Sequence, residues 1–152
     1  MTPKPRGWPR RIGAGSYLLA ASAIAILWSI AVMATCLWPA VIDRLDHDKL
    51  RWLVAAYDAT ALLASYPLTT SRLRDLSLST AWSRWAAFPL TMGVMLPMLC
   101  FWSGPRWDNG NGPAPESSGL LKIVAGVVAS AIAMMLLNAA IRAYVQAQAA
   151  FP

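Results

Sequence analysis

The stretch LKIVAGVVASAIAMMLLNAAIRAY, residues 121–144, decides the fold class of this chain. Its only charged residues, Lys122 and Arg142, lie close to its two ends. A helix of this length spans about 36 Å at about 1.5 Å per residue, and the hydrocarbon core of a bilayer is about 30 Å thick. The sequence therefore predicts a transmembrane helix over 121–144, followed by a short cytoplasmic tail over 145–152.

Three further spans are predicted on the N-terminal side of this helix. They cover residues 17–39, 51–70 and 85–102, and the second is the least hydrophobic. A basic tail, 1–16, precedes them, and a loop rich in Gly, Pro, Asn and Ser, 103–119, joins the third span to the fourth. A cleaved signal peptide is the alternative for 17–39, but that run exceeds the roughly 7 to 15 apolar residues of such a segment. We therefore expect an all-α, polytopic integral membrane protein with four transmembrane helices in a single domain, 17–144.

The amino-acid composition also indicates that lipid, rather than water, surrounds most of the chain. Of the 152 residues, 57% are apolar and 13% are charged, whereas soluble domains contain about 25% charged residues. The net charge of +6 comes from Lys and Arg that cluster beside apolar blocks, as expected for contact with a lipid bilayer and its anionic headgroups rather than with nucleic acid. Cys36 and Cys100 lie in no metal or redox motif, and no residue pattern resembles an active site. We expect no enzyme, no metal and no cofactor.

The orientation follows from the basic residues, which resist translocation and stay in the cytoplasm. With four spans, eight Lys and Arg fall on the side of the N-terminal tail and five on the other side. Tryptophan prefers the headgroup level, and it falls at the proposed outer ends (Trp38, Trp52, Trp102 and Trp107) and inner ends (Trp8, Trp82 and Trp85). Both termini are therefore predicted inside (N-in, C-in), with loop 103–119 outside.

Asp58 is the ionisable residue that lies deep in a predicted span, where a charge is costly unless it is paired or neutral. It shares one helix face with Arg51, Ser65 and Arg72, which recur every seven residues, and we expect this face to point into the bundle. The candidate partners at a similar depth are Ser29, Thr35, Lys122 and Ser130. Two interpretations stay open, a protonatable group that couples ion or substrate movement and, preferred, a hydrogen-bonded packing contact.

Other polar side chains fit packing or solvation better than chemistry. Asn138 is expected to hydrogen-bond another helix. An acidic cluster could suggest a divalent-metal site, but basic neighbours compete for its carboxylates, so a solvated cluster at headgroup level is preferred. The acidic cluster is Asp43, Asp46, His47 and Asp48, and the basic neighbours are Arg44, Lys49 and Arg51. Cys36 and Cys100 are predicted at one depth, so a disulfide stays open, although free thiols are preferred.

Short motifs between about residues 10 and 115 resemble one known family. They are Arg11-Ile12 followed by Tyr17, then Arg72-Leu73-Arg74-Asp75, then Ser79, Trp82 and Pro89, and last Asn109, Gly112, Pro113 and Pro115. In this pattern the chain is similar to a bacterial inner-membrane family, the YhaH-type domain of unknown function 805, with an additional C-terminal transmembrane helix. Ser71 and Arg74 stand where the family has an arginine and a histidine.

The resemblance implies a place in the bacterial cytoplasmic membrane but no chemistry, because the family has no settled activity. In its second motif, Arg72 and Arg74 can bind anionic lipid headgroups, while Asp75 can cap or pair the inner end of a helix.

The function that we expect is that of a non-enzymatic accessory or assembly subunit, which packs laterally against a larger membrane complex or a second copy of itself. A bundle this small has little interior of its own, which favours that expectation. The alternative is a small oligomeric proton-linked transporter or channel that uses Asp58. A third hypothesis is lipid sensing by Arg72 and Arg74.

Overall fold

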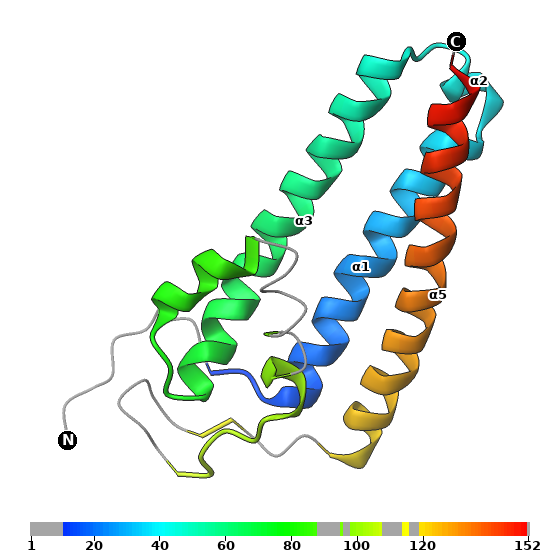
Figure 1. Ribbon diagram of the computed structural model, residues 1–152. Helices are drawn as coiled ribbons and strands as arrows, with labels where there is room; N and C mark the ends of the chain where they lie inside the picture. Colours follow the sequence, from blue (N-terminus) through cyan, green and yellow to red (C-terminus); the bar gives the residue numbers. More distant parts are fainter. Residues whose placement is uncertain (1–10, 88–94, 96–97, 108–113, 116–118, 152) are drawn as a thin grey trace.

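The computed structural model of the chain is helical throughout the part that it describes, with no strand in that part (Figure 1). The described residues are 11–87, 95, 98–107, 114, 115 and 119–151. Three long helices dominate, and a short α-helix and a 3₁₀ helix lie between them along the chain. The elements are α1 (Ala14–Leu37), α2 (Pro39–Ile42), α3 (His47–Asp75), η1 (Thr80–Ala87) and α5 (Leu120–Ala150).

Helix α1 ends where a proline requires it to end. Trp38 adopts an extended conformation, with φ −90° and ψ 110°, because the ring of the following Pro39 disfavours the helical region for the residue before it. Pro39 then occupies the first turn of α2, where its missing N–H costs nothing. The corner between α1 and α3 is therefore set by local sequence.

Both ends of α3 carry the signals of a helix terminus. At its start, the side chain of Asp46 accepts a hydrogen bond of 2.8 Å from the backbone N–H of Lys49, which satisfies one of the free donors of the first turn. At its end, Ser77 has φ 59°, and the backbone N–H of Leu78 bonds the carbonyl of Leu73 at 2.9 Å. This left-handed turn, usually made by Gly, satisfies the last carbonyls of the helix.

Helices α1 and α5 run in the same direction and lie side by side (Figure 1). Their contact is made by small buried residues that recur every seven positions, a spacing that keeps one face of each helix toward the other. This small-residue seam consists of Gly15, Ser22, Ser29 and Cys36 on α1 and of Gly126, Ala133, Ala140 and Ala147 on α5. Small side chains let two backbones approach closely, which is how helices associate where lipid removes the hydrophobic effect.

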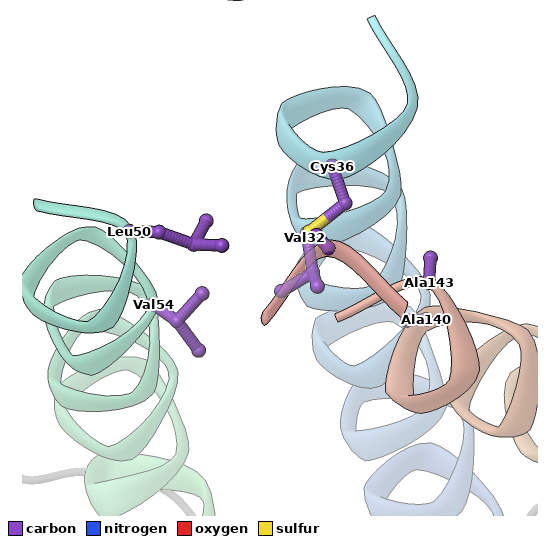
Figure 2. Close-up of a cluster of buried hydrophobic side chains, with 7 residues drawn as sticks. Val32, Cys36, Leu50, Val54, Ala140 and Ala143 are labelled. Atoms are coloured by element: carbon purple, nitrogen blue, oxygen red, sulfur yellow. The ribbon is translucent and has the colours of Figure 1, made fainter. Parts of the chain in front are cut away.

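Helix α3 runs antiparallel to α1 and contacts it at both ends. One cluster joins Leu50 and Val54 of α3 to Val32 of α1, and Figure 2 shows these side chains pointing toward one another beside Ala140 of α5. At the other end, Leu73 packs in a second cluster with Tyr17. The three long helices therefore form one bundle with two separate apolar clusters.

The bundle leaves most of its apolar surface uncovered. Helices α1 and α5 have mean hydropathies of 2.1 and 2.4 over their most apolar windows, yet only 22% and 11% of those windows are buried within the chain. The core helix of a soluble protein would be mostly buried. Two helices are thus long and apolar enough to cross a membrane, and this agrees with the predicted all-α membrane protein.

The predicted spans match these helices unequally. Spans 17–39 and 121–144 correspond to α1 and α5, whereas 51–70 lies within α3, which is longer than the predicted span and less apolar than α1 and α5. Span 85–102 falls partly on η1 and partly outside the described residues. Its described members Met95 and Leu99 belong to the cluster around Tyr17 and Leu73, so they lie at the end of the bundle where α1 begins.

The predicted sidedness needs correction. Arg11 bonds the carbonyls of Pro105 at 2.8 Å and Trp107 at 3.1 Å, so the start of loop 103–119 lies beside the N-terminal tail rather than across the bundle from it. At the other end of the bundle, the ring of Phe151 meets that of His47 edge to face, with centroids 6.4 Å apart. The start of loop 103–119 and the start of α1 therefore lie at one end of the bundle, and the end of α5 lies at the other, whereas the predicted arrangement separated that loop from the N-terminal tail.

Candidate functional site

Three buried charged side chains gather at the end of the bundle where α1 begins and α3 ends. Asp75, on the last turn of α3, pairs with Arg11 at 2.9 Å and with Arg72 one turn earlier. All three side chains are nearly inaccessible, at 1% for each arginine and 2% for the aspartate. Arg11, Arg72 and Asp75 are called the ion cluster below.

The remaining donors of the ion cluster hold three backbone segments together. Arg72 donates through Nε to the carbonyl of Leu99 at 2.7 Å and through its other nitrogens to the carbonyls of Ile12 and Trp102. Arg11 reaches the carbonyls of residues 105 and 107. A buried charge is tolerated only when it is paired and hydrogen-bonded, so the cluster explains why segments distant in sequence converge here.

Gly104 is part of this packing. A methyl group at its Cα would lie 2.5 Å from Oδ2 of Asp75 and 2.8 Å from the Asp75 carbonyl oxygen. Both distances are far inside van der Waals contact, so no larger residue fits without displacing the carboxylate. The loop approaches Asp75 so closely because residue 104 lacks a side chain.

The residues of the motifs that resemble the YhaH-type family lie in surroundings that differ from one motif to the next. Asp75 is paired with two arginines, and all three guanidinium nitrogens of Arg72 donate within the chain, which leaves Arg72 enclosed rather than facing headgroups. Arg74 is partly buried on the same helical turn. Asn109, Gly112 and Pro113 lie outside the described residues, and Pro115 lines a cleft beside the cluster.

That cleft, of about 730 Å³, opens between the start of α1, the first turns of α5 and the segment 100–106. One part of its wall is polar and includes Arg72, Asp75, Ser103 and Arg106. The other part is apolar and includes Leu18, Phe101, Ile123 and Val127. The cleft is therefore amphipathic, with its charged groups at the end of the bundle and its apolar groups along the helices.

Asp58 has a different partner from those expected. Its carboxylate accepts a 2.8 Å hydrogen bond from the indole N–H of Trp28 on α1, and its side chain is otherwise exposed. None of the four expected partners, all within the described residues, bonds Asp58. Ser29 and Thr35 bond backbone carbonyls of α1, and Ser130 bonds Ser22. Lys122 lies in the first turn of α5, at the end of the bundle where α1 begins. The signal that could have found Trp28 is its mid-span position, where an indole N–H needs an acceptor.

The predicted inward face of α3 is wrong for most of its length. Arg51 and Asp58 are exposed and only Arg72 is buried, because the face that packs on α1 is the one bearing Leu50 and Val54. Ser65 bonds the carbonyl of residue 62 in its own helix at 2.9 Å. Arg51 and Asp58 therefore lie on the exposed surface of α3, although Asp58 still accepts the hydrogen bond from Trp28 of α1.

Asn138 is exposed on α5, and within the part of the chain that the structure describes its side chain bonds no other helix. Within the acidic cluster, Asp46 caps α3 and binds the ammonium of Lys49 at 2.8 Å, and Asp48 lies 3.6 Å from His47. These bonds to Lys49 lower the pKa of Asp46 below its ordinary value of 3.8.

Cys36 and Cys100 are both free thiols, and they belong to the two separate clusters at opposite ends of the bundle.

Comparison of the chain with protein-family models, with curated proteins and with solved structures found no match.

Proposed function

We propose that this chain is a non-enzymatic, multi-pass protein of the bacterial inner membrane, which serves as an accessory or assembly subunit by packing laterally against a larger membrane complex. The observation that carries this proposal is the exposure of a polar side chain, Asn138, among exposed apolar residues of α5. Asp58 on α3 is also exposed, although it accepts a hydrogen bond from Trp28.

Exposed polar side chains are unfavourable in lipid, so their exposure indicates that a partner covers them. A carboxylate or amide that faces hydrocarbon is unfavourable by several kcal/mol, unless it finds a partner within the membrane. Asn138 lies between exposed Met135 and Ile141 on α5, so a neighbouring helix that covers this face would also cover apolar surface. A larger complex, or a second copy of the chain, supplies such a helix.

We further propose three crossings, by α1, α3 and α5, with the ion cluster on the cytoplasmic side. With three crossings, nine Lys and Arg fall on the side of the N-terminal tail and four on the other side, which is a stronger bias than the eight and five of four crossings. The nine are Lys4, Arg6, Arg10, Arg11, Arg72, Arg74, Arg84, Arg106 and Lys122, and the four are Arg44, Lys49, Arg51 and Arg142. The likeness to the YhaH-type family, which rests on short motifs, agrees with the inner membrane as the location.

The test compares Asn138→Leu with Gln146→Leu, which removes an exposed amide from the same helix closer to its end. Both variants are expressed at native level in the source bacterium, extracted in a mild detergent and examined by native mass spectrometry. We expect the wild-type chain to retain a membrane-protein partner, Asn138→Leu to lose most of it and Gln146→Leu to keep it. A wild-type chain recovered only as a monomer would contradict the proposal.

The second candidate function is proton-linked transport through Asp58, which the exposed carboxylate favours. Asp58→Asn keeps a hydrogen-bond acceptor for Trp28 and removes only the titratable charge. Loss of a proton-coupled flux in vesicles that contain this variant would support transport. Unchanged flux together with weaker recovery of the partner would support the subunit proposal.

A further inference from the structure

The amphipathic cleft beside the ion cluster has the size of a ligand site. Its volume of about 730 Å³ lies within the roughly 300 to 1,000 Å³ typical of small-molecule sites. On α5, Ile123 and Val127 line it and remain 45% and 51% exposed. An apolar wall that stays open in a membrane protein is available to an acyl chain.

The polar wall of the cleft carries positive charge. Asp75 is neutralised by its two arginines, so it presents no net negative charge to a ligand. Arg106 is exposed and lines the same wall, and α1 begins there at Ala14 with no acidic residue in its first turn. Arginine binds phosphate through parallel N–H bonds, so this wall complements an anionic phosphate group.

The order of these two walls matches the order of groups in a phospholipid. The charged wall lies at the end of the bundle and the apolar wall continues along α1 and α5 through Leu18, Ile123 and Val127. If α1 and α5 cross the membrane, the charged wall lies at headgroup level and the apolar wall faces the acyl region.

We propose that this cleft binds one anionic phospholipid, with its phosphate beside Arg106 and an acyl chain against Ile123 and Val127. This site differs from the predicted headgroup contact of Arg72, whose guanidinium is enclosed. The inference goes beyond the proposed subunit role and requires only that α1 and α5 lie in a membrane.

The experiment uses the full chain, purified in detergent, stripped of lipid and titrated with phosphatidylglycerol in native mass spectrometry. Arg106→Gln removes the charge at the exposed rim, and Val127→Trp fills the apolar part of the cleft. The matched controls are Arg44→Gln, in the corner at the opposite end, and Val128→Trp, since Val128 is also about half exposed (53%) and does not line the cleft.

We expect a single tight phosphatidylglycerol site in the wild type, weakened about tenfold by Arg106→Gln and abolished by Val127→Trp, with both controls unchanged. Wild-type affinity in both cleft variants would overturn the proposal, as would an equal loss in the two controls. Displacement of the lipid by an equal concentration of inorganic phosphate would show a free-anion site and would also overturn it. Because the isolated chain is measured, these outcomes are independent of whether a protein partner exists.

Discussion

The small-residue seam and the ion cluster hold the bundle together in opposite ways. The seam is a distributed contact, in which eight small residues on α1 and α5 repeat every seven positions and no one side chain dominates. The ion cluster concentrates its interactions in Arg11, Arg72 and Asp75. A distributed contact should lose stability in small steps, whereas a buried charge that loses its counter-charge should cost much more at once.

The largest effect is expected from Asp75→Asn, which leaves two buried guanidiniums without their shared carboxylate. Breaking a buried ion pair by removing one partner costs about 3 to 5 kcal/mol. We expect a loss of this size in the free energy of unfolding, measured by reversible denaturation in mixed micelles. Asp48→Asn is the control, because the Asp48 side chain is 81% exposed. Equal stability of the two variants would remove the distinction between cluster and seam.

The next effect tests the seam by forcing it apart. A methyl group on Gly126 would already lie 3.2 Å from a Leu18 methyl and 3.5 Å from the Gly15 carbonyl, so Gly126→Leu requires α1 and α5 to separate locally. Overpacking of this kind costs about 1 to 3 kcal/mol, measured in the same micelles. Val128→Leu adds volume on the exposed side of the same helix and should change little.

A smaller effect is expected for the polar contact within the seam. The hydroxyls of Ser22 and Ser130 lie 2.9 Å apart, and each also lies 2.8 Å from a carbonyl oxygen of its own helix, so one hydroxyl donates across the seam while the other donates to its own carbonyl. Hydrogen bonds between membrane helices contribute about 0.6 kcal/mol on average, so a double-mutant cycle of Ser22→Ala and Ser130→Ala should give a coupling of that order. A coupling of several kcal/mol would show that the seam also concentrates its stability.

The smallest effect lies outside both contacts, at the N-cap of α3. The folded-state pKa of Asp46 is lowered chiefly by its side-chain hydrogen bond with Lys49. Its contribution is therefore present above the unfolded-state value of about 3.8 and is lost as the pH falls through the lower folded-state pKa. Asp46→Asn keeps a capping acceptor without the titration, so it should flatten this acid-dependent step in the melting temperature.

Sequence reasoning found the helices that depend on local composition. The predicted spans 17–39 and 121–144 agree with α1, Ala14–Leu37, and α5, Leu120–Ala150, because an uninterrupted apolar run specifies a membrane-length helix by itself. The seven-residue repeat of small residues is also readable in the sequence from Gly15, Ser22, Gly126 and Ala133.

Sequence reasoning failed where the outcome depends on pairing across the chain. Nothing local to Trp102 or Pro105 indicates that their carbonyls receive donors from Arg72 and Arg11. The start of loop 103–119 was therefore expected away from the N-terminal tail, whereas its residues 105 and 107 bond Arg11. For Asp58, the preferred packing contact was a reasonable hypothesis, but its donor Trp28 depended on the rotation of two helices about their axes.

The sequence by itself determined that two stretches of this chain form helices long and apolar enough to cross a membrane, because apolar content and backbone hydrogen bonding within a helix are properties of each segment alone. Only the tertiary structure decided which ends of the helices meet, which face of α3 is covered and where the amphipathic cleft opens. Those features follow from the pairing of a few charges, Arg11, Arg72 and Asp75, with each other and with backbone carbonyls distant in sequence. Such pairings leave no periodic trace in the order of the residues.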